Sequence, residues 1–150
     1  MIQRKQSIFL FLSLIVGIAC LCLPIGLFEP EAMGKESIMM NLWIQSGEGV
    51  KDFRVWPLFA ILLASLPIQL FAIFDFHKRK RQISLCTLSM VLMLAWYVAY
   101  AYFALAVPEK MTFGVGFAAC LPLVSIILLF LAKQGIKSDE ALVRAADRIR

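Results

Sequence analysis

Four long stretches of this chain contain no Asp, Glu, Lys, Arg or His, and this absence limits the possible folds more than any other feature. The stretches cover residues 7–28, 55–74, 83–107 and 111–132. About 20 apolar residues are enough for a helix to cross the hydrocarbon core of a bilayer. Because lipid offers no hydrogen-bond partners to the backbone, such segments form helices. The sequence therefore predicts an all-α membrane protein, a single domain over residues 1–150 built on a four transmembrane helix bundle.

Composition and charge support this class. Apolar residues make up 61% of the chain, whereas soluble domains usually contain about 45–50%. The net charge of +5 would suggest nucleic-acid binding in a soluble protein. Here the basic residues lie beside the apolar stretches, and membrane orientation explains them more simply, so no direct nucleic-acid binding is expected.

The basic residues are divided unequally between the connecting segments. The larger group lies before the first stretch, between the second and third, and after the fourth: Arg4, Lys5, Lys78, Arg79, Lys80, Arg81, Lys133, Lys137, Arg144, Arg148 and Arg150. The smaller group lies in the other two connections: Lys35, Lys51, Arg54 and Lys110. Segments rich in Lys and Arg stay on the cytoplasmic side. Both termini are therefore predicted to be cytoplasmic.

The N-terminus also has an alternative interpretation. "MIQRKQSIFLFLSLIVGIAC" resembles a lipoprotein signal, with basic residues, an apolar core and a small residue before Cys20. However, Gly17 stands where such signals usually carry a larger aliphatic residue, and the apolar run continues past Cys20. The segment is therefore predicted to be an uncleaved first helix.

The outer loop, residues 29–54, is predicted to contain a small extracytoplasmic β-hairpin. "IMMNLWIQ" and "VKDFRVW" resemble strands and flank the Gly-containing turn "SGEG". An isolated hairpin is marginally stable in water, so we expect it to lie across the helix ends. Trp43 and Trp56 suit the boundary there between lipid and water. The second outer loop, "PEKMTFG" at residues 108–114, is expected to add little.

The cysteines raise one enzymatic alternative. Cys20 and Cys120 lie at similar depths, roughly 12 Å below the outer surface at 1.5 Å per residue, and would meet if the first and fourth spans touch. A thiol-redox or quinone-linked membrane enzyme could use Cys20, Cys22 and Cys120. Membrane enzymes of this kind keep their cysteine pairs in extracytoplasmic segments, whereas these cysteines, with Cys86, lie in or beside apolar stretches. Apolar burial leaves a thiol unreactive, so a packing role is favoured.

Other candidate sites are weaker still. Ion and proton transport usually needs ionisable residues at membrane depth, and the four stretches have none. Asp75 is expected to balance Lys78 or Arg79. His77 is the only histidine, which excludes a haem held by two histidines of one chain, and the cysteines lack the close spacing of a zinc site. We therefore expect no catalytic residue, no cofactor and no metal.

An aromatic stripe runs along the third stretch at helical spacing: Met93, Trp96, Tyr97, Tyr100 and Ala104. Such a stripe can line a lipid or quinone groove, but it is more often helix packing together with interfacial aromatic residues. We favour packing.

The cytoplasmic tail, residues 133–150, is charged and helical in pattern. On a helix, one face of residues 139–150 carries Ala141, Leu142, Ala145, Ala146 and Ile149. Ser138 caps the start, and Glu140 and Arg144 form an i,i+4 pair. The pattern predicts a short C-terminal amphipathic helix. The alternative is a solvated extension of the fourth span, broken at Gly135.

This tail motivates the leading hypothesis, a non-enzymatic scaffold that docks a cytosolic or membrane protein. The proposed contact residues are Leu142, Arg144, Ala145, Ala146, Arg148, Ile149 and Arg150. A separate helix this short is marginal in water. The tail is therefore expected to be mobile alone and ordered when a partner, or the chain's own loop at residues 78–81, covers Leu142 and Ile149.

A family resemblance covers the whole chain. The start "MIQRKQSIFL", the basic loop at residues 78–81 and the end "DEALVRAADRIR" resemble domain-of-unknown-function family 4293. The resemblance implies a small four-span protein of the bacterial inner membrane. It also implies a link to transcription, through genes near that of the terminator Rho, and it supplies no catalytic residue.

Overall fold

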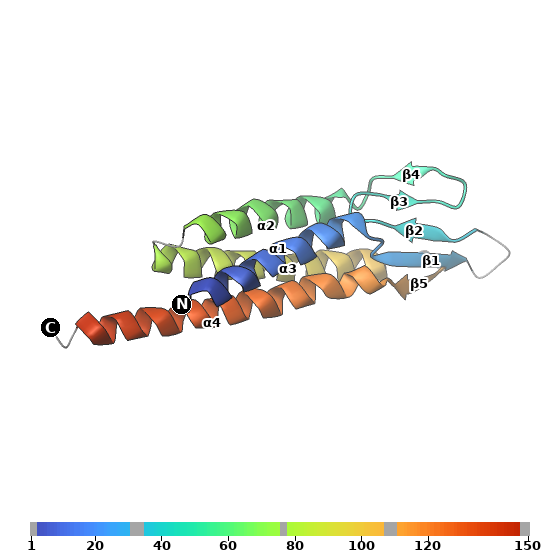
Figure 1. Cartoon of the computed structure of the whole chain (residues 1–150). Helices are drawn as coiled ribbons and strands as arrows, with labels where there is room; N and C mark the ends of the chain where they lie inside the picture. The colour runs from blue at the N-terminus through green and yellow to red at the C-terminus, as the bar shows by residue number, and fades with distance from the viewer. Residues whose placement is uncertain (1–2, 31–34, 76–77, 107–110, 148–150) are drawn as a thin grey trace.

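The computed structural model describes residues 3–30, 35–75, 78–106 and 111–147, which form four long helices and one sheet (Figure 1). The helices are α1 (Gln3–Cys22), α2 (Trp56–Phe74), α3 (Arg79–Leu105) and α4 (Leu121–Asp147), with the short 3₁₀ helix η1 (Phe117–Cys120) before α4. The strands are β1 (Gly26–Pro30), β2 (Ser37–Met39), β3 (Ile44–Gln45), β4 (Lys51–Asp52) and β5 (Met111–Val115).

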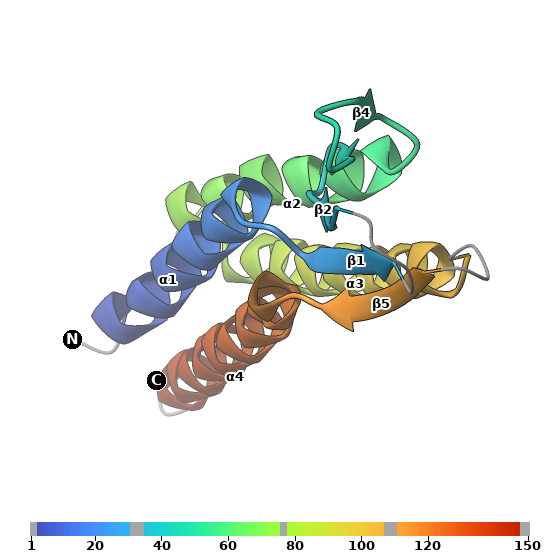
Figure 2. The same cartoon turned by 90° about the vertical axis from the view of Figure 1, so that its right-hand side faces the viewer.

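The four helices run alternately up and down and pack in a closed ring. Helix α1 contacts α2 and α4, and α3 contacts the same two helices. The sheet lies at one end of the bundle, which we call the sheet end, and the chain termini lie toward the other, which we call the terminal end (Figures 1 and 2). Helices α2 and α3 agree with the predicted stretches 55–74 and 83–107 to within a few residues.

The first predicted span, residues 7–28, is too long at its outer end. Helix α1 stops at Cys22 and the chain turns into β1 at Gly26. Pro24 explains the stop, because proline has no backbone N–H with which to continue the helical hydrogen bonds. The apolar residues that follow are buried by the sheet instead, since Ile25 is fully buried and Phe28 nearly so.

The fourth predicted span, residues 111–132, is wrong at its start. Its first residues form β5, which pairs antiparallel with β1 in a register that places Phe113 opposite Phe28. The two rings lie 5.1 Å apart. Gly116 then lets the chain pass close to Ile25, because a Cβ at position 116 would lie 2.6 Å from the carbonyl carbon of Ile25. The second outer loop therefore contributes an edge strand, contrary to the expectation that it adds little.

The predicted hairpin is present, but it belongs to a larger sheet. Strands β3 and β4 pair antiparallel around the "SGEG" turn, where Gly49 has a φ of 86°. The full order is β4-β3-β2-β1-β5. A sheet of five strands solves the instability of a lone hairpin. The hairpin forms one edge of the sheet, and the sheet takes its strands from both connections at this end, α1 to α2 and α3 to α4. We call this sheet the cap of the bundle.

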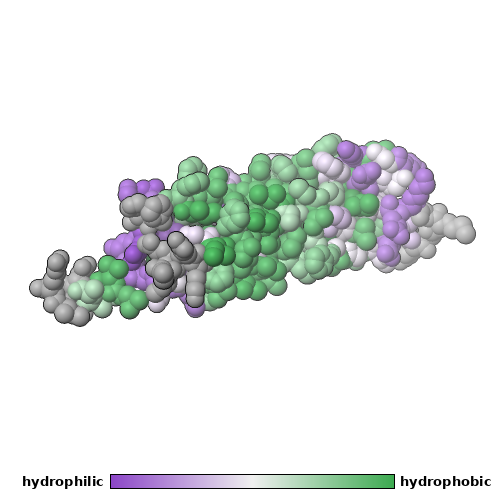
Figure 3. All heavy atoms as spheres, in the orientation of Figure 1, coloured by the Kyte–Doolittle hydropathy of each residue, from purple (hydrophilic) through white to green (hydrophobic). Residues whose placement is uncertain are grey.

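The outside of the bundle is apolar between two polar ends (Figure 3). Side chains such as Phe71 and Val98 are 67% and 72% exposed, and exposed apolar surface on this scale is rare in soluble proteins. Trp56–Phe74, Arg79–Leu105 and Phe117–Ala146 are long and apolar enough to cross a membrane, whereas the apolar helical segment Gln6–Cys22 is shorter. Length and composition thus support three of the four predicted spans and suggest a membrane protein.

Asn41, in the turn between β2 and β3, connects the sheet to two helices. Its side chain is fully buried. The amide nitrogen donates to the carbonyl oxygen of Cys20 at 2.6 Å, and the amide oxygen accepts from the indole N–H of Trp96 at 2.9 Å. In a longer helix the carbonyl of Cys20 would accept from residue 24, but that residue is proline. Asn41 therefore satisfies the end of α1 and holds α3 beside it.

We expect Asn41→Ala to lower the free energy of unfolding by about 1–3 kcal/mol, because it leaves a buried carbonyl and a buried indole N–H without partners. Thermal unfolding of the detergent-purified protein, followed by tryptophan fluorescence, measures the change. Gln45→Ala is the control, since Gln45 is exposed on β3. Equal melting temperatures for the two variants would contradict the role of Asn41.

Candidate functional site

Helix α4 continues without interruption from Leu121 to Asp147 and runs past the other helices at the terminal end (Figure 1). A separate tail helix and a break at Gly135 are therefore both wrong. Extending an existing helix needs no new nucleus, so the nucleation cost of a separate helix is absent. Gly135 serves packing instead, because a Cβ there would lie 2.9 Å from Cγ of Gln6. The small residue lets α1 approach α4 closely.

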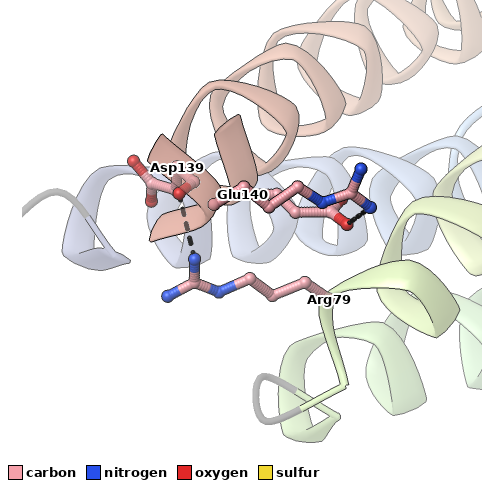
Figure 4. A network of polar contacts seen from close by, with 4 residues as sticks. Arg79, Asp139 and Glu140 are labelled. Atoms are coloured by element: carbon pink, nitrogen blue, oxygen red, sulfur yellow. Dashed lines mark hydrogen bonds and ion pairs between the residues drawn. The ribbon is translucent and has the colours of Figure 1, made fainter. Parts of the chain in front are cut away.

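Asp139 is the centre of the contacts at this end. Its side chain is 9% exposed and accepts a hydrogen bond from the side-chain amide of Gln6, itself 7% exposed. Arg79, in the first turn of α3, donates from Nη1 to the backbone carbonyl of Asp139 at 3.1 Å (Figure 4). Residues of α1, α3 and α4 therefore meet at one position. The expected contact between the basic loop and α4 exists, but it reaches the backbone of Asp139 rather than its carboxylate.

The predicted pair of Glu140 and Arg144 is confirmed. Nη2 of Arg144 lies 2.6 Å from Oε1 of Glu140, and the two side chains are 67% and 21% exposed respectively. Exposed pairs of this kind contribute only about 0.3–0.5 kcal/mol. The pair matters for position, because it fixes the guanidinium of Arg144 beside Glu140, one helical turn away on α4.

The proposed contact face of the tail is open. Leu142 is 59% exposed, and its neighbour Val143 is 46% exposed; Ala145 and Ala146 are also exposed. Arg148, Ile149 and Arg150 lie outside the described residues. The basic loop does not cover Leu142 here, and the dependence of this segment's order on a cover stays a prediction.

A recess of about 480 Å³ lies between the start of α3 and the extension of α4. We call it the terminal groove, and its lining residues are Lys78, Arg79, Lys80, Arg81, Glu140, Val143 and Arg144. The sequence contained the basic run and the Glu140–Arg144 pair as separate signals. The loop was expected to meet the tail at Leu142, but the unbroken course of α4 places Glu140, Val143 and Arg144 beside it instead.

Asp75 has a partner, but not the expected one. Its carboxylate lies 3.1 Å from Nε of Arg81, where Lys78 or Arg79 had been expected. Arg81 lies in the first turn of α3, which begins at Arg79. That turn brings the side chain of Arg81 back toward Asp75 at the end of α2. His77 lies outside the described residues.

The cysteines are divided into two kinds. All four are free thiols, with Cys20 and Cys86 buried and Cys22 and Cys120 exposed, so the expectation of burial is wrong for the latter two. Sγ of Cys20 lies 3.5 Å from the carbonyl oxygen of Ala118, which places α1 against the segment that carries Cys120. Among the residues that the structure describes, no three His, Cys, Asp or Glu side chains are grouped to hold a metal ion. The thiol-redox alternative stays a prediction.

Neutral polar side chains meet inside the bundle. The hydroxyls of Ser13 and Ser125 lie 2.6 Å apart, and Ser13 also donates to Oε1 of Gln69 at 3.0 Å. All three residues are fully buried. These contacts join α1, α2 and α4 without an ionisable group, so we assign them to helix association rather than to proton transfer.

The aromatic stripe of α3 packs inside the bundle, as favoured. Met93 and Trp96 are fully buried, Tyr100 nearly so, and the rings of Trp96 and Tyr100 stack at 5.1 Å. A recess of about 490 Å³ does lie beyond the stripe, between the sheet and the end of α3, with Phe28, Val55 and Tyr102 among its lining residues.

We expect Gln6→Ala to lower the free energy of unfolding by about 1–3 kcal/mol, since it leaves the buried carboxylate of Asp139 without this donor. In a double-mutant cycle, Gln6→Ala combined with Asp139→Ala should cost less than the sum of the single changes, by at least about 0.5 kcal/mol. Ser138→Ala, at an exposed neighbour on α4, serves as the control for the melting measurements. Strictly additive effects would show that the two side chains do not interact.

Comparison with known proteins adds a family but no relative of known activity. A search of the curated proteins finds no match to this chain. The family model described as "Domain of unknown function (DUF4293)" matches residues 2–149, which is nearly the whole chain, and the protein therefore belongs to that family.

Proposed function

We propose that this chain is a non-enzymatic, four-span protein of the bacterial inner membrane that docks a protein partner through the exposed part of α4. Both termini are cytoplasmic in this proposal. Support for the orientation comes from charge: Lys78 to Arg81 lie at the terminal end, and the sheet end carries few cations. Support for four spans comes from α1, which packs along α2 and α4 over its length and shares their apolar outer surface.

The observation that carries the docking proposal is the reach of α4. From Glu140 to Asp147 the helix extends about 10 Å at 1.5 Å per residue, beyond the contacts of Asp139 with Gln6 and Arg79 (Figure 1). Leu142 and Val143 stand exposed on this extension, beyond the charged residues Lys133 and Lys137 of the same helix. Apolar side chains on a pre-formed helix bind a partner at little ordering cost. We therefore expect Leu142, Ala145 and Ala146 to form the contact, with Arg144 beside them.

The topology has a direct test. A fluorescent protein that matures only in the cytoplasm, fused after Arg150, should be bright. Alkaline phosphatase, which is active only outside the cytoplasm, should be active when inserted at Gly49, in the turn between β3 and β4. A dark C-terminal fusion together with an inactive insertion would reverse the orientation. A bright C-terminal fusion with an inactive insertion, or a dark fusion with an active insertion, would put both sites on one side of the membrane and would contradict three spans between them.

The docking face is tested best by point substitution. Truncation after Lys137 would remove Asp139, which contacts Gln6 and Arg79, and would disturb the bundle itself. Leu142→Asp leaves those contacts intact and places a charge in the proposed interface. Ser138→Asp adds the same charge at an exposed position of the same helix.

Chemical cross-linking in native membranes, followed by quantitative mass spectrometry, should show a partner whose yield falls roughly tenfold or more in Leu142→Asp, in keeping with the loss of a central apolar contact. The yield in Ser138→Asp should match that of the wild type. The same proteins in the same amounts from both variants would exclude docking at this face.

A further inference from the structure

The terminal groove is far more cationic than its packing requires. Five of its seven lining side chains carry a positive charge, and the one carboxylate, that of Glu140, is paired with Arg144. Each of the three arginines is held by a contact outside the basic run: Arg79 by the carbonyl of Asp139, Arg81 by Asp75, and Arg144 by Glu140. The groove is therefore held in shape by residues of α2 and α4.

These contacts leave most of the donors free. A guanidinium has five N–H groups, and contacts with the described residues use one nitrogen of each arginine. Lys78 and Lys80 have no ion-pair partner among the described residues, which do not include Phe76 and His77. Arginine forks and lysine ammoniums in one recess are the groups that bind phosphate.

A second recess of about 500 Å³ adjoins the groove on the outer side of α2 and α3. We call it the lateral recess, and its lining residues are Ile68, Phe71, Phe74, Asp75, Arg81 and Leu85. Phe71 and Phe74 are 67% and 70% exposed, so the recess opens to the apolar outside of the bundle. Arg81 lines both recesses. A cationic site and an apolar site thus share one wall.

We propose that the two recesses together bind one anionic phospholipid of the cytoplasmic leaflet. Its phosphate lies in the terminal groove against Lys78, Lys80 and Arg81, and an acyl chain lies in the lateral recess along Phe71 and Phe74. Basic pockets between helices at this surface bind anionic headgroups. A free phosphate or an acidic peptide would use the groove but would gain nothing from the lateral recess. The inference rests on the proposed membrane position and not on the docking of a protein at Leu142.

Native mass spectrometry of the full-length protein in mild detergent tests the site. Phosphatidylglycerol should be retained, whereas phosphatidylcholine with the same chains should not. Lys78→Gln with Lys80→Gln should weaken retention of phosphatidylglycerol by about tenfold or more. Lys133→Gln with Lys137→Gln removes the same charge from the same end but outside the groove, and retention should stay unchanged. Equal losses in both double variants would mean that general charge, not a site, attracts the lipid.

Two further variants should change the retention of phosphatidylglycerol in opposite directions. Glu140→Gln removes the one carboxylate among the described lining residues, so retention should rise by about fivefold. Phe71→Ser should weaken retention of phosphatidylglycerol. Glycerol 3-phosphate, which has the headgroup chemistry without chains, should compete poorly with the lipid. Competition by glycerol 3-phosphate at concentrations similar to the lipid, with no effect of Phe71→Ser, would overturn the lipid site in favour of a free-phosphate site.

Discussion

The carbonyl of Cys20 has no backbone N–H to accept from within the helix, because residue 24 is proline. The hydrogen bond that replaces this missing contact determines much of the structure at the sheet end. Asn41 donates to that carbonyl and accepts from Trp96, so the turn between β2 and β3 must lie over the ends of α1 and α3. The chain between Cys22 and Asn41 then has to double back, and β1 and β2 pair as it does so. Tyr100 adds a hydrogen bond to the carbonyl of Ile25 at 2.8 Å. Pro24 thus ends α1 and leaves the carbonyl of Cys20 free to accept from Asn41. That hydrogen bond positions the sheet over the ends of the helices.

Polar contacts between α1 and the continuous segment η1–α4 recur at three levels along the bundle. Gln6 meets Asp139 at the terminal end, Ser13 meets Ser125 in the middle, and Cys20 meets Ala118 at the sheet end. In an apolar solvent, hydrophobic burial does not drive helices together, and close packing with interhelical hydrogen bonds does. Each contact is modest, but their spacing fixes the register of the first helix against the last. This ladder accounts for the position of a helix whose own apolar segment is the shortest of the four.

The sequence was most informative where the physics is local. Charge-free runs predicted α2 and α3 within a few residues, and the Gly-containing turn predicted the pairing of β3 with β4. The errors lie where contacts between residues far apart in the sequence determine the local structure. Nothing near residues 111–115 indicates a strand, because its partner is β1, far back in the chain. Gly135 looked like a helix breaker because glycine is a poor helix former, but its close contact is with Gln6 of another helix. The terminal groove could not be predicted until α4 was known to be continuous.

The basic residues of the terminal end have two physical roles that operate together. The positive-inside rule concerns only their number on one side of the membrane, and it would be satisfied by any arrangement. The structure is more specific. Arg79 joins α3 to α4, Arg81 joins α3 to Asp75 at the end of α2, and Arg144 pairs with Glu140 within α4. The charged end of the chain is therefore a continuation of the last helix, ordered by Asp139 and Glu140 as they approach the basic loop. A tail of acidic residues facing that loop would neutralise it, yet among the described residues only one carboxylate, that of Glu140, lines the groove. The excess of positive charge that remains there is the reason for our proposal that the groove binds an anion.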